Sequence, residues 1–238
     1  MSSGTGPAVV DPTLRRRIKP QEFEDFFDPR ELRKETCLLY EISWGRRHNI
    51  WRHTGLNTEK HVEINFIEKI TSERFFRPST RCSITWFLSW SPCGECSKAI
   101  TEFLSQHPNV TLFIYVARLY YHTDPGNRQG LRDLVCRGVT VQIMTEKEYC
   151  YCWKNFVNYP PSNKVYWPRY PNMWMRLYIL ELLCIILGLP PCLRILRRNQ
   201  HEPPLFKLTP QRCHYERIPP PFAAIFWATG LMWPGSWR

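Results

Sequence analysis

The sequence predicts an α/β protein: a three-layer α/β/α sandwich around a five-stranded mixed sheet, followed by a C-terminal hydrophobic extension. Three observations lead to this prediction. Segments of β-prone residues alternate with segments of helical periodicity between residues 37 and 187. Hydrophobic residues make up 43% of the 238 positions, which is enough for a sizeable core. After Pro190-Pro191, the alternation gives way to scattered prolines and apolar clusters.

The first predicted elements are a pair of strands and a helix. Residues 37–44 and 50–53 are apolar or β-branched, and Gly45 between them indicates a turn. Apolar side chains at helical spacing predict a helix over residues 59–70, with His61 in its first turn.

A strand and a second helix come next. Residues 82–90 are strongly β-prone, and Pro92 suits the first position of a helix that reaches about residue 106. Cys93 and Cys96 are then three apart on one face of that helix. The positive N-terminal end of the helix favours thiolate over thiol.

The remaining predicted elements are a strand, a helix, a strand and two further helices, over residues 110–117, 129–136, 139–144, 146–156 and 173–187. A Pro-rich connection beginning at residue 159 separates the last two. The apolar stretch 177–189 is interrupted by Glu181 and is too short to span a bilayer, so we interpret it as part of a buried helix.

Four residues predict a catalytic metal site. His61 and Glu63 form a His-x-Glu motif, and Cys93 and Cys96 form a later Pro-Cys-x-x-Cys motif. A catalytic zinc takes three protein ligands and keeps one position for water, which His/Cys/Cys satisfies. The carboxylate of Glu63 is then free to move protons, as hydrolysis by zinc-activated hydroxide requires.

Two alternatives compete for the cysteine pair. A Cys-x-x-Cys motif is also typical of redox pairs and of structural zinc sites. A structural site needs a fourth protein ligand, but Cys150 and Cys152 are one residue too close together and Cys213 and His214 are adjacent. Neither alternative requires the His-x-Glu motif, so the catalytic interpretation is favoured.

The chain is basic, with a formal net charge of +11. Residues 160–238 contribute much of the excess, with ten basic and three acidic side chains. Such an excess favours a polyanionic partner or simply promotes solubility, and charge alone supports the two about equally. The ten cysteines follow a polar N-terminus without an apolar signal region, which predicts reduced thiols in cytosol or nucleus.

Several motifs together resemble the APOBEC family of polynucleotide cytidine deaminases. The word Ser-Trp-Ser-Pro-Cys-Gly-Glu-Cys at residues 89–96, preceded by His-Val-Glu at 61–63, carries the resemblance. Residues 13–17, 28–34 and 189–193 extend it over nearly the whole chain and point to a messenger-RNA-editing member of the family.

The resemblance implies a cytidine deaminase fold with a defined domain organisation. The composition divides the chain into a basic N-terminal arm over residues 1–20, a domain over 21–190 and a C-terminal hydrophobic region over 191–238. The resemblance implies that the second is a zinc-dependent cytidine deaminase domain and that the third is an interaction region.

The resemblance also assigns roles at the metal. His61, Cys93 and Cys96 match the ligands of one Zn²⁺ per chain, and Glu63 matches the proton shuttle. The implied reaction is hydrolytic deamination of cytidine to uridine in RNA, with messenger-RNA editing of the apolipoprotein B type, and of deoxycytidine in single-stranded DNA.

A target base must leave its stack to reach the metal, so aromatic walls are expected. Trp90 and Tyr120 match positions that line the family's base pocket, and Asn57 matches a residue that contacts the target nucleotide. Core packing is the alternative for the two aromatic residues. Tyr121 and His122 lie where relatives read the preceding nucleotide.

Two further sets of residues are expected to bind partners. Three interpretations are open for a set of basic residues: nuclear import, phosphate contact on RNA, or a solvated charged face. The residues are Arg15, Arg16, Arg17, Arg33 and Lys34. The resemblance implies homodimerisation and contact with an RNA-binding cofactor protein through the C-terminal region, including Leu182, Ile185 and Leu187, although packing against the sheet is an alternative. Phe66 and Phe87 match positions linked to RNA contact, but their spacing favours the core.

The chain is therefore predicted to be a polynucleotide cytidine deaminase of nucleus and cytoplasm. Its expected partners are single-stranded RNA and DNA, and no membrane association is expected. A free-nucleoside deaminase shares the zinc chemistry, and an inactive zinc-stabilised RNA-binding or scaffold protein shares the ligands. The basic, aromatic-rich composition argues against the first, and Glu63 argues against the second.

Overall fold

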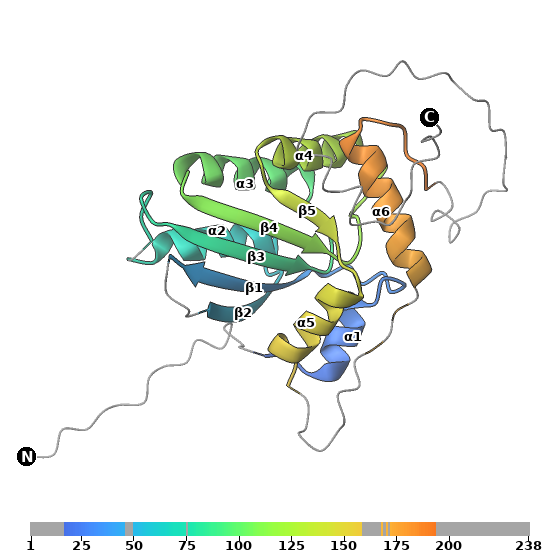
Figure 1. The fold of residues 1–238 in the computed structure, drawn as a ribbon, viewed down its shortest axis with the longest axis horizontal. Coiled ribbons are helices and arrows are strands. Elements are labelled where there is room, and N and C mark those ends of the chain that lie inside the picture. The colour runs from blue at the N-terminus through green and yellow to red at the C-terminus, as the bar shows by residue number, and fades with distance from the viewer. Residues whose placement is uncertain are drawn as a thin grey trace, which may run out of the picture. The chain divides into compact units, whose positions relative to one another are not determined.

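The predicted mixed sheet is confirmed in a computed structural model, which describes residues 17–45, 50–74, 76–158, 168, 170 and 172–193. Its five strands are β1 (Cys37–Trp44), β2 (Ile50–Leu56), β3 (Cys82–Leu88), β4 (Val110–Val116) and β5 (Thr140–Ile143). Their order across the sheet is β2-β1-β3-β4-β5 (Figure 1). Strand β1 pairs antiparallel with β2 and β3, whereas β3, β4 and β5 run parallel.

Six helices in the described ranges complete the three layers: α1 (Pro20–Phe27), α2 (Val62–Ser72), α3 (Gly94–Gln106), α4 (Pro125–Cys136), α5 (Glu146–Phe156) and α6 (Asn172–Ile186). Buried side chains of α2, α3, α4 and α6 share one hydrophobic cluster with one face of the sheet. Those of α1 and α5 share a second cluster with the opposite face. None of these helices is both long and apolar enough to cross a membrane.

Strand β3 shows how the sequence produces two cores. Successive side chains of a strand point to opposite faces. Ile84, Trp86 and Leu88 therefore lie in the cluster with α2 and α3, whereas Phe87 lies in the cluster with α1 and α5. The alternation is clear over residues 82–86, where Ser83 and Thr85 are polar and half-buried. It ends at Phe87, because there the second face of the strand is covered as well.

Helix α1 and the start of α4 were missed by the sequence analysis. Helix α1 buries Phe23, Phe26 and Phe27, and at its N-terminus the Lys19 backbone N–H donates to the Glu22 carboxylate at 2.8 Å. Helix α4 begins at Pro125, four residues earlier than predicted, because Asp124 caps it and accepts the Asn127 N–H at 2.8 Å.

Parts of the predicted organisation lie outside the described residues. These are Arg15, Arg16, the Pro-rich connection that begins at residue 159 and almost all of the extension, from residue 194 onward. Within the described ranges, Ile18 is buried and forms a parallel bridge with Val157. The three domain boundaries stay predictions.

Candidate active site

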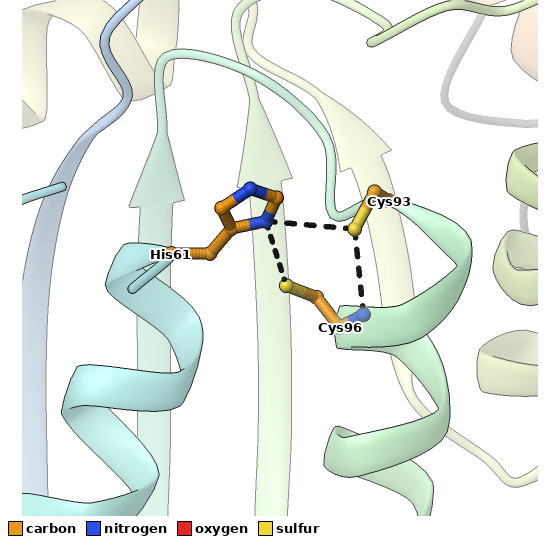
Figure 2. A group of neighbouring side chains, drawn as sticks. All are labelled: His61, Cys93 and Cys96. Carbon is orange, nitrogen blue, oxygen red and sulfur yellow. Dashed lines mark hydrogen bonds between the residues drawn. The ribbon is translucent and has the colours of Figure 1, made fainter. Parts of the chain in front are cut away.

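Two helix N-termini bring the predicted metal ligands together (Figure 2). His61 and Cys93 are the N-cap residues of α2 and α3, one position before each helix, and not in the first turn as predicted. Cys96 lies in the first turn of α3. The His61 Nδ1 atom is 3.2 Å from Cys96 Sγ and 3.5 Å from Cys93 Sγ.

The three donor atoms fit a zinc ion. One imidazole nitrogen and two sulfurs lie within 4.8 Å of one another, and the described residues contain no other group of three such ligands. A set of three protein ligands leaves a coordination position for water, as catalytic zinc requires.

The electrostatics of the two cysteines also call for a cation. The hydrogen bond from Cys96, with help from the Cys96 backbone N–H and from His61, lowers the pKa of Cys93 to about 5. The same pairing and burial raise the pKa of Cys96 above its ordinary value. One thiolate therefore forms readily and the second is opposed by the first, so a divalent cation is what stabilises both.

Glu63 lies beside this group in the first turn of α2 and is 4% exposed. Its Oε2 atom is 3.7 Å from Cys96 Sγ. Burial raises the pKa of Glu63, and its own backbone N–H opposes that effect in part. A carboxyl group with a raised pKa next to a metal-binding group is suited to accept and return protons.

Asn57 supports the start of α2. Its Oδ1 atom accepts the Val62 N–H at 2.9 Å, directly after His61. This bond satisfies one of the free N–H groups at the helix N-terminus and fixes the residue that carries the imidazole. Contact between Asn57 and a nucleotide stays a prediction.

Trp90 and Tyr120 form an aromatic wall next to the cysteines. Their rings meet edge to face at 6.2 Å, and Tyr120 makes a second such contact with Tyr121 at 4.6 Å. Trp90 and Tyr120 are half-buried, and Tyr121 is 68% exposed. These three rings are therefore not simple core residues, although their roles in base binding stay predictions.

Arg118 holds this wall in place and was missed by the sequence analysis. It is fully buried, and its guanidinium lies 4.4 Å from the centre of the Trp90 ring. Its N–H groups donate to backbone carbonyls of Phe26, Asp28, Glu31 and Ser89. The signal for it was a charged residue directly after an apolar strand. Three of its four carbonyl partners lie about 90 residues away in sequence, and only the fold reveals them.

Asn127 and two glycines were also missed. The Asn127 Oδ1 atom accepts the Gly94 N–H at 2.8 Å, so α4 fixes the first residue of the helix that carries the cysteines. The two helices approach closely: a Cβ atom at Gly94 would lie 2.9 Å from the Gly126 carbonyl oxygen. Asn127 also donates to the Tyr120 carbonyl oxygen at 3.5 Å, so helix α4 holds both Tyr120 and the start of the helix that carries the cysteines.

The predicted partner-binding residues are dispersed. Arg17, Arg33 and Lys34 are exposed, and Arg33 pairs with Asp25 at 2.8 Å. Arg15 and Arg16 lie outside the described residues.

The hydrophobic residues predicted for interaction do not share one environment. Leu182 and Ile185 are 5% and 0% exposed within the core, whereas Leu187 is 42% exposed. Packing within the chain accounts for the first two, and self-association through them stays a prediction. Phe66 and Phe87 are both in the core, as their spacing favoured.

Comparison with known proteins agrees with this geometry. The model of the APOBEC4-like AID/APOBEC-deaminase family matches residues 26–159. The C→U-editing enzyme APOBEC-1 of Mesocricetus auratus is 77% identical over 98% of this chain and all of its own length. The proteins with the same name from Mus musculus and Homo sapiens are 74% and 64% identical, over 97% and 100% of this chain and the whole of each relative. The chain therefore belongs to the AID/APOBEC family of deaminases.

Proposed function

We propose that this protein is a C-to-U editing enzyme that hydrolyses cytidine to uridine in messenger RNA and deoxycytidine to deoxyuridine in single-stranded DNA. The observation that carries the proposal is the His61, Cys93 and Cys96 group with Glu63 buried beside it. The identity of 64–77% over the full length to proteins named C→U-editing enzymes supports the choice of reaction.

The reaction needs an activated water and a proton carrier. When held by His61, Cys93 and Cys96, Zn²⁺ acts as a Lewis acid that makes water nucleophilic near neutral pH. Glu63 takes a proton from that water and delivers it to N3 of the cytosine ring as C4 is attacked. Glu63 then transfers the second proton to the amino group, which leaves as ammonia and gives uracil. Atoms balance, because one water is consumed for each ammonia released.

The aromatic wall explains why a base in a flexible strand is the substrate. Trp90 and Tyr120 present ring surfaces next to the cysteines, where a base removed from its stack is held by aromatic contact. Cation–π contact with Arg118 fixes the Trp90 ring, and its Nε1 atom donates to the Arg33 carbonyl at 2.7 Å. A rigid wall lowers the entropy cost of holding the base in position.

Partners follow from charge and from the family. We assign to the net charge of +11 a role in binding the phosphate backbone of RNA and single-stranded DNA, with exposed Arg17 and Lys34 among the contributors. We further propose homodimerisation and an RNA-binding cofactor protein through the C-terminal region, and residence in nucleus and cytoplasm. Cell fractionation and sedimentation of the full chain test these points.

One assay tests the reaction. The purified full chain is incubated with single-stranded RNA, single-stranded DNA and free cytidine, and uracil or uridine is scored against a Glu63→Ala control. The proposal expects product from the two polynucleotides and none from the control, with zinc content equal in both proteins. Product from free cytidine alone would identify a nucleoside deaminase, and nucleic-acid binding without product would identify a non-catalytic RNA-binding protein.

A further inference from the structure

The apolar helix α6 contains one fully buried carboxylate, Glu181, which the deamination chemistry does not use. Burial alone would raise its pKa, but hydrogen bonds from His122, the Leu193 N–H and Arg128 overcome this and hold the pKa at about 2. Glu181 is therefore ionised at neutral pH. A buried charge of this kind is costly unless its partners are fixed, so the partners matter.

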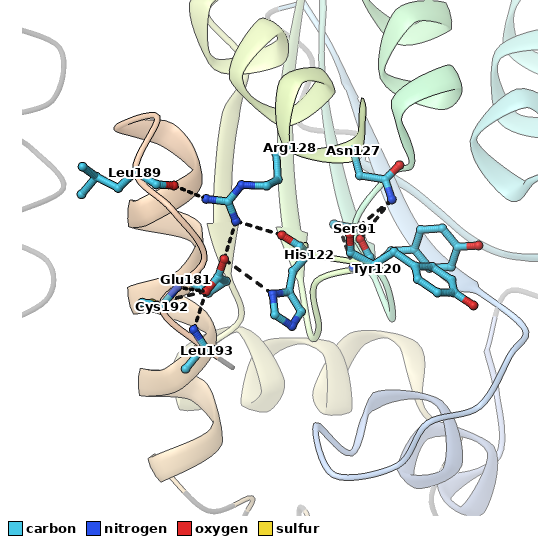
Figure 3. Close-up of polar contacts among 10 residues, drawn as sticks. Ser91, Tyr120, His122, Asn127, Arg128, Glu181, Leu189, Cys192 and Leu193 are labelled. Carbon is cyan, nitrogen blue, oxygen red and sulfur yellow. Dashed lines mark hydrogen bonds and ion pairs between the residues drawn. The ribbon is translucent and has the colours of Figure 1, made fainter. Parts of the chain in front are cut away.

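Arg128 of α4 is the main partner and links three segments (Figure 3). It is 6% exposed, and its Nη1 atom donates to Glu181 Oε1 at 2.5 Å and to the His122 carbonyl oxygen at 2.9 Å. Its Nη2 atom donates to the Leu189 carbonyl oxygen at 2.5 Å. The rigid guanidinium fork makes all three contacts at once, which a lysine ammonium on a flexible stem does not reproduce.

The second oxygen of Glu181 holds the chain that follows α6. Oε2 accepts the backbone N–H groups of Cys192 and Leu193, each at 2.9 Å. The chain turns back after Gly188, whose φ of +68° lies in the left-handed region, and Leu193 is 3% exposed. Residues 189–193 are thus fastened to the same ion pair as His122.

His122 belongs to the loop that forms the rim of the aromatic wall. Residues 120–124 form the second part of the loop that joins β4 to α4. Tyr121 has a φ of +36°, an unfavourable value for a bulky residue. The residue is 68% exposed, and its ring contacts the Tyr120 ring edge to face. Such backbone strain persists only where surrounding contacts over-determine it, and Arg128 supplies one of those contacts through the next residue.

We propose that Glu181 is a positioning residue that, through Arg128 and His122, fixes the Tyr121 ring in place. Tyr121 and His122 match the positions at which relatives read the nucleotide next to the target cytidine, so Glu181 would act on that contact from a distance. The same carboxylate makes the position of residues 189–193 a determinant of that contact. This inference rests on the proposed function, since it assumes a polynucleotide substrate. An exposed ring on a strained but fixed loop, next to a base pocket, is the form that sequence-tolerant base stacking takes.

The test uses the full chain and single-stranded DNA with one deoxycytidine and a fluorescent 2-aminopurine as its 5′ or 3′ neighbour, in separate oligonucleotides. Quenching of 2-aminopurine on binding, measured in a Glu63→Ala background, reports stacking. Kinetics in the active background report KM and kcat. Glu181→Gln is expected to lose quenching as Tyr121→Ala does, and to raise KM about tenfold with kcat within about threefold, as expected when one stacking contact is lost.

Two further variants separate positioning from general damage. Arg132 lies in α4, as Arg128 does, and donates to the Ile185 carbonyl oxygen of α6 at 3.1 Å. Arg132→Gln removes this charge and hydrogen bond without changing a contact of the loop that carries Tyr121. The variant should therefore keep the quenching and the KM of the unaltered chain. Arg128→Lys retains the counter-charge of Glu181 but loses the fork, and should weaken quenching even if Glu181→Gln fails to fold.

Each outcome decides a different question. Unchanged quenching and KM in Arg128→Lys and in a folded Glu181→Gln would overturn this inference while the deaminase function stands. The same loss in Arg132→Gln would also overturn it, because the effect would then be general loosening of α6. Absence of product from the unaltered chain would instead refute the proposed function.

Discussion

The metal-binding group and the Arg128–Glu181 pair are two polar sites in one domain, and they are partnered in opposite ways. The metal-binding group is half open: His61 is exposed and Cys93 is half-buried. The hydrogen bonds to the Glu63 carboxylate within the described residues come from the Cys96 thiol and its own backbone N–H. Both oxygens of Glu181, by contrast, accept hydrogen bonds, from Arg128 on one side and from Cys192 and Leu193 on the other. His122 Nδ1 lies 3.5 Å from the first of these oxygens.

This difference separates chemistry from positioning. A group that must exchange protons or bind a ligand keeps some of its hydrogen-bonding positions free. A group that holds other residues in place has these positions filled by the protein itself. By this criterion the proposed proton carrier Glu63 keeps the capacity that its role needs, and Glu181 is a fixed carboxylate, although both are almost fully buried. Substitutions at the two sites should therefore change different measured quantities.

The largest effect is expected from Glu63→Gln. Glutamine keeps the size of the side chain but does not accept the proton, so kcat should fall by at least about 10²–10⁴-fold, the usual contribution of a general acid–base group. Zinc content and the free energy of unfolding should stay close to those of the unaltered chain. Metal analysis and urea unfolding serve as controls, and an active variant with full zinc would assign the proton transfer to another residue.

The two sites also differ in how far sequence predicts them. His61, Glu63, Cys93 and Cys96 were found because each half of the motif is local, and the spacing within each half reflects ligand geometry at a helix N-terminus. The five strands were found for a similar reason, since period-two and apolar runs are local signals. Helix α1 was missed because its three buried phenylalanines fall within only eight residues.

Positioning residues were missed for a different reason. Arg128 and Glu181 are 53 residues apart, and Arg118 donates to carbonyls about 90 residues away. The two arginines donate largely to backbone oxygens, and Glu181 accepts two backbone N–H groups. Every residue has such backbone groups, so no side-chain pattern in the sequence marks these contacts. Glu181 within an apolar helix was visible as an interruption, but its meaning required the position of Arg128.

The second prediction concerns stability and pH at the fixed carboxylate. The pKa of Glu181 is about 2 in the folded chain, below its ordinary value of 4.5. Its stabilising contribution is thus complete above pH 4.5 and is lost as the pH falls towards 2. The difference in pKa corresponds to about 3 kcal/mol, since one unit is about 1.4 kcal/mol. Glu181→Gln should therefore be less stable by about that amount at pH 7.

Urea unfolding of both chains between pH 7 and pH 3 measures this contribution. The gap between them should narrow below pH 4.5, because a protonated glutamate resembles glutamine. Loss of zinc at low pH affects both chains alike and cancels in the difference. A gap that stays constant from pH 7 down to pH 3 would show that the pKa of Glu181 is not lowered in the folded chain.

The smallest effect is expected at the contact that joins the two sites, where α3 and α4 pack through glycines. A Cβ atom at Gly130 would lie 2.8 Å from Ser97 Cβ, whereas one at Gly126 would meet only the Asp124 side chain at 3.2 Å. Alanine in a helix gains about 1 kcal/mol over glycine, and overpacking costs about 1–3 kcal/mol. Gly130→Ala should therefore destabilise the chain by about 1 kcal/mol and Gly126→Ala should not, as measured by urea unfolding. Equal effects would show that the close approach of α3 and α4 at Gly130 is not rigid.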